Sequence, residues 1–486
     1  MASGPRNPPF GDPSGIVSPN APESKTLFSP TEVWYTWAML SAIRLRAKPN
    51  GMAITQSKEH LLPFALALVA LGLRLAQLMF QPLWWEEGWS LYFAGSDLGA
   101  ILGLTAVDIH PPLYYLLLHA WIRLFGSSVL AVRLMSVLLG TATVPLLYAT
   151  GRWLRGERAG LLAALLLALS PFHVYYSQEV RMYGLATLFG LLALYFALRW
   201  DAGNRGWRGG GLLGYVLAAA AALYTDYYAA LLLVALNLVM LVRCFRARRL
   251  ARDVFAWLAA QAIVLVLYLP WLWYAAVKLL TYVRFKVGVE EYPSQALLTY
   301  VTRHLAALTW GHSEGSLVAW WWLGLLPPLL LTLGLVVVFR SRRQSLSNWK
   351  AGSAWWSLTI VFVALLGGFV VNVAFPFNPP RGERLLLLAL PAYLLLFTEG
   401  LLLLWRQRPA LAALPAASFA LLAVLSLALF YTVPRYPDDD YRPLAERIEA
   451  LALPSDAILS VHPWQVGYFQ AYLPDAETRP TLVLTP

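Results

Sequence analysis

The chain has 486 residues, of which 59% are hydrophobic and only 13% are charged. This charged share is about half of that in soluble domains, and a soluble fold of this size has no way to bury so much apolar surface. The composition therefore excludes an ordinary soluble enzyme and indicates a membrane protein. The net charge of +11 does not point to nucleic acid, because the basic residues lie mainly between apolar runs, where they act as topology signals.

Residues 1–58 are predicted to form a cytoplasmic basic tail that is largely disordered. The tail begins with a stretch rich in Pro, Ser, Gly and Asn, without the apolar core of a signal peptide. Residues 33–39, followed by Arg44, Arg46 and Lys48, are compatible with an interfacial helix or with a non-specific basic tail, and we favour the tail.

Eleven apolar runs approach the length of about 20 residues that a transmembrane helix needs. These predicted spans are residues 61–82, 129–151, 159–176, 182–200, 211–225, 227–245, 254–274, 318–339, 353–375, 384–404 and 410–432. With a cytoplasmic N-terminus, every Arg-rich cluster between them falls in a cytoplasmic loop. We therefore predict an all-α polytopic protein of the plasma membrane, with residues 59–433 as its transmembrane domain.

The same topology leaves three segments outside, at residues 83–128, 275–317 and 434–486. We expect juxtamembrane helices in the first segment, and the apolar run 113–125, which is too short to cross, is predicted to be one of them on the outer surface. The last combines a helical pattern at 441–451 with strand-like stretches at 457–461 and 481–484. It is therefore predicted to be a short extracytoplasmic α/β segment.

The first outer segment carries two acidic motifs. They are Leu83-Trp84-Trp85-Glu86-Glu87 and Asp108-Ile109-His110-Pro111-Pro112-Leu113-Tyr114-Tyr115. Adjacent carboxylates directly after a span are costly unless something pairs or uses them. One interpretation is a general base, since apolar neighbours and a second charge raise the pKa of a carboxyl group. The other is a pair of solvated acids in an aromatic interface belt, and the residues alone leave both open.

Further charged motifs lie beside later spans. They read Tyr176-Ser177-Gln178-Glu179-Val180-Arg181-Met182-Tyr183 and Pro380-Arg381-Gly382-Glu383-Arg384. An arginine beside the end of a span can bind a phosphate, while a nearby carboxylate orients the arginine. A structural pair between helix ends explains Glu179 and Arg181 equally well. Arg381 and Arg384 would meet a phosphate head group at the outer leaflet.

Three other residues leave alternatives open. Asp226 is either an acceptor contact or the cap of the following helix, and capping is the better explanation. His304 and His312 either approach the site or are ordinary surface histidines. The sequence has no Walker phosphate loop, no dinucleotide fingerprint and no Asp-x-Asp pair, so a membrane-resident donor fits better than a soluble nucleotide.

The acidic and charged motifs described above, and their order over roughly residues 60–435, resemble those of the dolichyl-phosphate-mannose-protein mannosyltransferase family. That family is part of the GT-C class, which also contains the bacterial aminoarabinose transferases. The resemblance implies a GT-C-like fold and a sugar donor linked through phosphate to a polyprenol. It also implies transfer with inversion on the extracytoplasmic face, to a hydroxyl of a protein, lipid or glycan. We predict no metal and no other cofactor.

The resemblance also implies roles for single residues. Glu86 would deprotonate the acceptor hydroxyl, and Glu87 would orient the acceptor or the loop. Relatives usually have Asp at the first position, so this chain departs by one methylene. The donor phosphate would be bound by His110, Arg181, Arg381 and Arg384. The predicted substrate-binding residues are Asp108, Tyr114, Tyr115, Glu179, Tyr183 and Asp226, although aromatic packing is an alternative for the tyrosines.

Two other classes of protein compete with a transferase. A transporter or lipid-linked sugar flippase would carry charges along a pathway at the bilayer midplane. Here the spans hold few charges and the acids gather at one face, which favours the transferase. An inactive membrane scaffold is the third possibility, which the Glu at position 86 keeps open.

Overall fold

The structure is a computed structural model. It describes residues 61–202, 210–246, 251–290, 293–312, 315–341, 354–376, 381–453, 455–473 and 481–484. The predicted tail at 1–58, with its possible interfacial helix at 33–39, lies outside the described residues. The described chain is mainly helical and has a two-stranded sheet near its C-terminal end.

The first part of the described chain contains a run of helices up to residue 246. They are α2 (Leu61–Leu75), α3 (Trp85–Gly95), α4 (Leu98–Ala106), α5 (Leu113–Phe125), α6 (Val129–Arg155), α7 (Glu157–Leu169), α8 (Pro171–Tyr176), α9 (Tyr183–Asp201), α10 (Gly211–Leu223) and α11 (Ala229–Arg246). The expected short helix over residues 113–125 is confirmed as α5.

The second part mixes long helices with 3-10 segments, labelled η. They are α12 (Ala251–Glu290), α13 (Leu297–Trp310), η2 (Gly315–Leu325), α14 (Leu326–Ser341), α15 (Ala354–Ala374), η4 (Gly382–Ala389), α16 (Leu390–Gln407), α17 (Pro409–Thr432), η5 (Pro437–Asp439), α18 (Arg442–Leu451), β1 (Ile458–Ser460), α19 (Pro463–Tyr472) and β2 (Thr481–Val483). Among the described residues, 8 helices are long and apolar enough to cross a membrane. The protein is therefore a multi-pass membrane protein.

The predicted number of eleven spans is not confirmed. Three of the predicted spans contain the shorter helices α2, α7 and α10, of 15, 13 and 13 residues. Soon after α2 ends, Gln77 has a left-handed φ of 52°, which is incompatible with a continuing helix. The run 159–176 is split after α7, because Ser170 caps a new helix that starts at Pro171.

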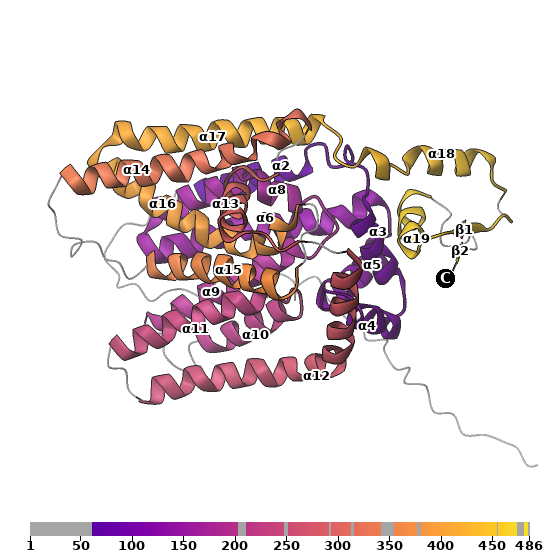
Figure 1. Ribbon diagram of the computed structural model, residues 1–486, viewed down its shortest axis with the longest axis horizontal. Helices are drawn as coiled ribbons and strands as arrows, with labels where there is room; N and C mark the ends of the chain where they lie inside the picture. The colour runs from indigo at the N-terminus through magenta and orange to yellow at the C-terminus, as the bar shows by residue number, and fades with distance from the viewer. Residues whose placement is uncertain are drawn as a thin grey trace, which may run out of the picture. The chain divides into compact units, whose positions relative to one another are not determined.

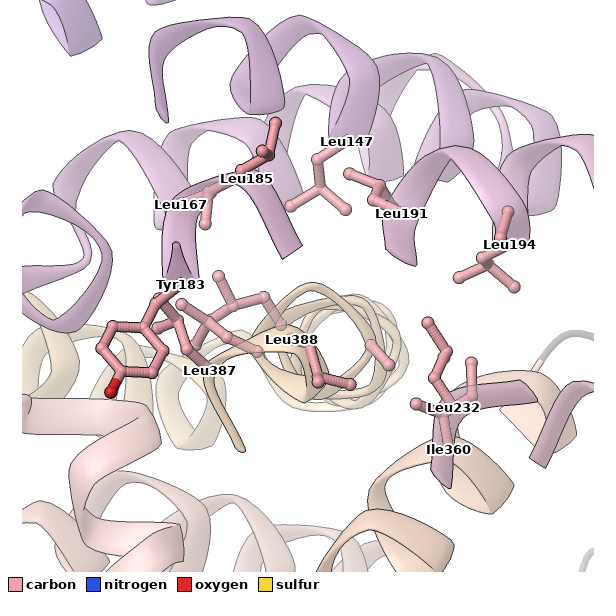
Figure 2. Close-up of a cluster of buried hydrophobic side chains, with 14 of the residues drawn as sticks. Leu147, Leu167, Tyr183, Leu185, Leu191, Leu194, Leu232, Ile360, Leu387 and Leu388 are labelled. Atoms are coloured by element: carbon pink, nitrogen blue, oxygen red, sulfur yellow. The ribbon is translucent and has the colours of Figure 1, made fainter. Parts of the chain in front are cut away.

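The long helices lie side by side in a bundle with a shared apolar core (Figure 1). Figure 2 shows part of this core, where leucines and an isoleucine from different helices meet. The labelled side chains are Leu147, Leu167, Leu185, Leu191, Leu194, Leu232, Ile360, Leu387 and Leu388. Tyr183 lies at the edge of this cluster, at the first residue of α9. The core thus fixes the end of α9 and the adjoining η4, both of which carry predicted site residues.

The predicted outer segment 275–317 is not a loop. Helix α12 continues to Glu290 and bends along its course (Figure 1), and α13 then packs against α8, α15 and α17. Both helices are apolar enough to pack, but the polar residues spread through this stretch hide that pattern from a search for spans. The prediction of a loop here is therefore wrong.

The α/β character of the C-terminal segment is confirmed. Strands β1 and β2 pair in parallel, with Ile458 opposite Thr481. Helix α18 occupies the predicted helical stretch, whereas α19 was not predicted. Figure 1 shows α18, α19 and the two strands at the end of the bundle where α3, α4 and α5 gather. Helix α19 packs directly on α3, the helix that carries the acidic pair.

Candidate active site

The site is built around the first turn of α3. Glu86 and Glu87 are both buried there, at 7% and 1% exposure. Carboxylates are favoured at this place because a helix N-terminus carries a partial positive charge. Since successive helical residues point about 100° apart, with 3.6 residues per turn, the two side chains face different surroundings.

The Glu86 carboxylate lies between two guanidinium groups. Its Oε2 is 3.2 Å from Nε of Arg181, and its Oε1 forms an ion pair with Arg384. Nη1 of Arg181 also donates to the Glu86 carbonyl and to Oγ of Ser90, each at 3.1 Å. Arg384 donates from Nε to the Tyr183 hydroxyl at 2.9 Å. The three charged groups sum to one positive charge, which suits a bound anion.

The side chain of Glu87 is instead buried inside the protein. Its Oε2 is 3.1 Å from Nη2 of Arg133, and its Oε1 accepts a hydrogen bond of 2.9 Å from the Val180 backbone N–H. Arg133 donates further to the carbonyls of Leu78, Gln81 and Pro82. Glu87 therefore ties α3 to α6 and to the segment before α9. This geometry fits the predicted orienting role better than a catalytic one.

Two cavities meet at Glu86. The first, called the His110 cavity, has a volume of about 350 Å³. It is lined by Trp85, Glu86, Trp89, Phe93, Leu104, Val107, Asp108, Ile109, His110, Arg181, Tyr183, Tyr282, Lys286, Arg384 and Leu385. The second, called the Arg303 cavity, has a volume of about 530 Å³. It is lined by Trp84, Trp85, Glu86, Arg303, Ala306, Ala307, Gly311, His312, Val318, Trp321, Arg381, Glu383, Arg384, Tyr436 and Asp439. Trp85, Glu86 and Arg384 border both.

The His110 cavity combines an apolar wall with a charged end. Nδ1 of His110 is 3.0 Å from Oδ2 of Asp108. Burial lowers the pKa of the His110 imidazole below its usual value, although Asp108 opposes part of this effect. Burial alone would raise the pKa of the Asp108 carboxyl, but the contact with His110 and other neighbours lowers it. A neutral imidazole beside an ionised carboxylate is therefore favoured.

The Arg303 cavity is lined by aromatic rings and by charges of both signs. Glu383 lies 3.9 Å from Nη1 of Arg303 and 3.9 Å from Nδ1 of His312. Arg381 has an unusual left-handed φ of 61°, and its guanidinium lies 4.7 Å from the centre of the Tyr436 ring. Such strained backbone is concentrated at functional sites. Arg381 thus borders a different cavity from His110 and Arg181, with which it was predicted to act.

The remaining predicted residues lie around this centre. Tyr114 and Tyr115 are fully buried and pack edge to face, and neither borders the His110 cavity or the Arg303 cavity. Glu179 and Glu87 border a space of about 10 Å³, enough for roughly one water molecule. Burial and the neighbouring Glu87 raise the pKa of Glu179 to about 8. Oδ1 of Asp226 accepts a hydrogen bond of 2.8 Å from the Tyr228 N–H just before α11, a local capping contact of the kind preferred above.

Both histidines of the predicted outer segment are buried, so the interpretation as surface residues is wrong. His312 borders the Arg303 cavity, and its Nε2 lies 2.8 Å from the Tyr176 hydroxyl. His304 packs against Tyr300 with ring centres 4.0 Å apart.

The sequence motifs did not identify Arg133 as a buried residue near the site, although a single arginine inside an apolar span is itself a signal of a buried partner. Among the described residues, no group of three His, Cys, Asp or Glu is placed to hold a metal ion.

Parts of the chain and its fold are similar to known proteins. Residues 109–274 match the model of the dolichyl-phosphate-mannose-protein mannosyltransferase family. The structure of ArnT from Cupriavidus metallidurans bound to undecaprenyl phosphate has a TM-score of 0.56 and 16% identity, covering 88% of this chain and 90% of its own. Its apo state gives a TM-score of 0.55 and 16% identity, with coverage of 88% and 86%.

An archaeal relative has the same fold. The oligosaccharyltransferase AglB from Archaeoglobus fulgidus, in complex with an inhibitory peptide and a dolichol-phosphate, has a TM-score of 0.53 and 12% identity. The match covers 89% of this chain and 65% of AglB. Comparison with curated protein sequences gave no match.

The fold and the partial family match are similar to those of membrane glycosyltransferases of the GT-C class. The resemblance to the dolichyl-phosphate-mannose-protein mannosyltransferase family, predicted from the motifs, is confirmed, and the matched part of the chain is residues 109–274.

Proposed function

We propose that the protein moves a sugar from a polyprenyl-phosphate donor to an acceptor hydroxyl, with inversion and with Glu86 as general base. The observation that carries this proposal is the position of the Glu86 carboxylate, where the two cavities meet and between two arginines. A base at such a junction reaches an acceptor in one cavity and a sugar held in the other.

The His110 cavity suits the donor. Its apolar side, which includes Trp89, Phe93 and Leu104, is compatible with the start of an isoprenoid chain, and Arg181 provides a charged end. Arginine forms two parallel hydrogen bonds with a phosphate, which fixes the phosphate in one orientation. Two proteins with the same fold were solved with undecaprenyl phosphate or dolichol-phosphate bound, which supports a lipid phosphate here.

Donor binding would change the protonation of His110. Burial lowers the pKa of its imidazole. A phosphate brings negative charge beside the ring and so raises that pKa. The imidazolium would then donate from Nε2 to the phosphate while Nδ1–H donates to Asp108, 3.0 Å away. His110 and Arg181 would together stabilise the charge that develops on the leaving phosphate.

Transfer would follow as a single displacement. A phosphate in the His110 cavity competes for the N–H groups of Arg181 and Arg384, which loosens their pairs with Glu86 and frees a carboxylate oxygen. That oxygen takes the proton of the acceptor hydroxyl, whose oxygen attacks the anomeric carbon. The bond between this carbon and the phosphate oxygen breaks on the opposite side, and the polyprenyl phosphate leaves with the electron pair. Attack from the opposite side inverts the anomeric centre.

The distribution of basic residues supports the membrane orientation. With the N-terminus in the cytoplasm, the Arg clusters after α6 and α11 are cytoplasmic. The turn before α9 and the segment that carries Glu86 then face the outside of the plasma membrane. Residues 1–58 would be the cytoplasmic tail, and residues 434–486 would lie outside with the active site.

The test is a transfer assay with purified protein and polyprenyl-phosphate sugars that carry a radioactive label in the sugar. We expect label to move to a sugar, lipid or peptide acceptor in wild type and in Glu157→Gln, which changes an exposed carboxylate at the other end of α6 and α7. Transfer should disappear in Glu86→Gln. Equal transfer in Glu86→Gln would overturn the role of Glu86. Movement of the lipid-linked sugar across reconstituted vesicles without a covalent product would replace the transferase by a flippase.

A further inference from the structure

We propose that the C-terminal segment, residues 441–473, holds the catalytic turn of α3 in position. We call this segment the clamp. The proposal rests on the proposed function, because it takes Glu86 as the residue that needs to be placed. According to this proposal, the N-terminal part of the chain is not sufficient to position α3. The place of α3 beside Arg181 and Arg384 also depends on residues more than 350 positions away in the sequence.

The backbones of α3 and α19 touch at two glycines. A Cβ atom added to Gly467 would overlap the carbonyl oxygen of Gly88. A Cβ atom added to Gly88 would lie 2.5 Å from the carbonyl oxygen of Trp464. Any side chain at either position would therefore force the two helices apart. Gly88 is only two residues after Glu86, so the closest contact of the clamp lies within one turn of the proposed base.

The clamp also contacts the chain before Glu86. Nη1 of Arg442 donates to the carbonyl of Phe80 at 3.1 Å. The Tyr472 hydroxyl accepts a hydrogen bond of 2.7 Å from the Leu83 backbone N–H. This N–H lies in the extended stretch that leads into α3, where the helix does not provide a partner. The entry to α3 is thus held at two points by the clamp.

A third set of contacts lies at the far end of α3. The side chain of Gln470 covers Gly95, where an added Cβ atom would come within 2.8 Å of its Oε1. The carbonyl of Gln470 in turn accepts a hydrogen bond of 2.7 Å from Oγ of Ser127, just before α6. The contacts of the clamp therefore bracket Glu86 on both sides, from Phe80 to Gly95.

The length of α3 explains why such support is needed. A helix of 11 residues is not stable by its own hydrogen bonds, so its position depends on what packs against it. A displacement of about 1 Å at a catalytic group reduces the rate by about 100-fold. The clamp residues are thus positioning residues, which act on the reaction through the placement of Glu86.

The first test compares Gly467→Ala with Gly103→Ala. Gly103 lies on α4 in the same part of the molecule, and a Cβ atom there would meet no atom within 4 Å. We expect Gly467→Ala to lower kcat for sugar transfer by about 10- to 100-fold, with the KM of donor and acceptor changed less than about twofold, because only the transition state is affected. Gly103→Ala should behave as wild type.

Hydrogen exchange gives a readout that needs no activity. In Gly467→Ala, the amides of residues 84–95 should exchange faster than in wild type, while the amides of α6 and α9 keep their protection. This measurement separates the clamp from the proposed function: faster exchange together with an enzyme that transfers no sugar would contradict the function and not the clamp. Unchanged exchange and unchanged kcat in Gly467→Ala would overturn the clamp.

A milder pair of variants covers the case in which Gly467→Ala does not fold. Tyr472→Phe removes the acceptor for the Leu83 N–H, whereas Tyr468→Phe, on the same helix, removes a hydroxyl that has no hydrogen-bond partner among the described residues. We expect a several-fold lower kcat and faster exchange in α3 for Tyr472→Phe only. Equal behaviour of the two variants would also overturn the proposal.

Discussion

Glu86 and Glu87 are neighbours in the chain, yet their surroundings differ in almost every respect. Glu86 borders both large cavities and forms ion pairs with Arg181 and Arg384. Glu87 borders neither of these two cavities but a space of about 10 Å³, and its carboxylate contacts Arg133 and a backbone N–H. One residue step along α3 turns the side chain by about 100° and takes it from a place that substrates can reach to one that they cannot.

This contrast shows how one acidic pair can serve two needs. A general base has to be reached by the acceptor, and its ion pairs have to be exchangeable for contacts with the substrate. An anchor has to be satisfied before any substrate arrives, because an unpaired buried charge is costly. The neighbourhood of Glu86 meets the first condition, and that of Glu87 meets the second.

The largest effect is expected for activity at position 86. Glu86→Gln should lower kcat by about 10²- to 10⁴-fold, the usual contribution of a general base. Its melting temperature in detergent should stay close to that of wild type, since solvent that enters the cavities can replace the lost contacts of the two arginines. A large loss of stability with little loss of kcat would reverse the roles of the two acids.

The opposite pattern is expected at position 87. Glu87→Gln leaves the Arg133 guanidinium buried without a counter-charge, which costs about 3–5 kcal/mol of folding free energy. The cost should appear as a lower denaturant midpoint in equilibrium unfolding. Because Glu87 is the carboxylate that pairs with Arg133 among the described residues, a second change, Arg133→Met, should recover part of the loss. Additive losses in the double variant would show that the pair is not coupled.

A smaller loss of activity is expected for Arg384→Lys. An ammonium group keeps the positive charge but cannot contact Glu86 and the Tyr183 hydroxyl from one planar group, as the guanidinium does. We expect kcat to fall by about tenfold, with the fold retained. The matched change Arg303→Lys alters an arginine that borders only the Arg303 cavity, and it should change the KM of the acceptor more than kcat. The reverse result would exchange the roles assigned to the two arginines.

The last prediction concerns pH. The pKa of Glu179 rises from its ordinary value of 4.5 to about 8 in the folded protein, because of burial and the nearby Glu87. Between these two values the folded state binds more protons than the unfolded state, so its stability falls as the pH rises from about 4.5 to about 8. Thermal unfolding across this range should show that slope in wild type and a flatter one in Glu179→Gln. An unchanged slope would mean that Glu179 is ionised in the folded protein.

Much of the fold could be predicted from the sequence, because a long apolar run has few alternatives to a membrane-spanning helix. Helix α5 was expected over the residues it occupies, since a mainly apolar run of 13 residues is too short to cross. The break at Ser170 and Pro171 was not expected, because hydropathy averages over a window and overlooks a cap in the middle of it. Juxtamembrane helices were expected in the first outer segment, but the position of α3 was not, because its first turn is dominated by residues that also suit an interface loop.

The sequence predicted which residues lie at the candidate site better than it predicted how they are arranged there. The motifs located Glu86, His110, Arg181 and Arg384, which the structure brings together around the His110 cavity. They did not separate Arg381 from this group, because a sequence does not show which side of a helix entrance a side chain occupies. Contacts between distant segments, such as Gly88 with Gly467, leave no periodic signal and could not be predicted.

The shared border of the two cavities has a consequence for the kinetics. Arg384 and Glu86 border both cavities, so in the proposed reaction the donor and the acceptor would be bound at the same time, one in each cavity. Initial rates at varied donor and acceptor concentrations should therefore give intersecting double-reciprocal lines, as for a ternary complex, and no sugar should remain covalently attached to the enzyme when the acceptor is absent. The spent lipid phosphate would occupy the same cavity as a new donor, so it would act as a competitive inhibitor against the donor, and its departure would limit how soon the next cycle begins.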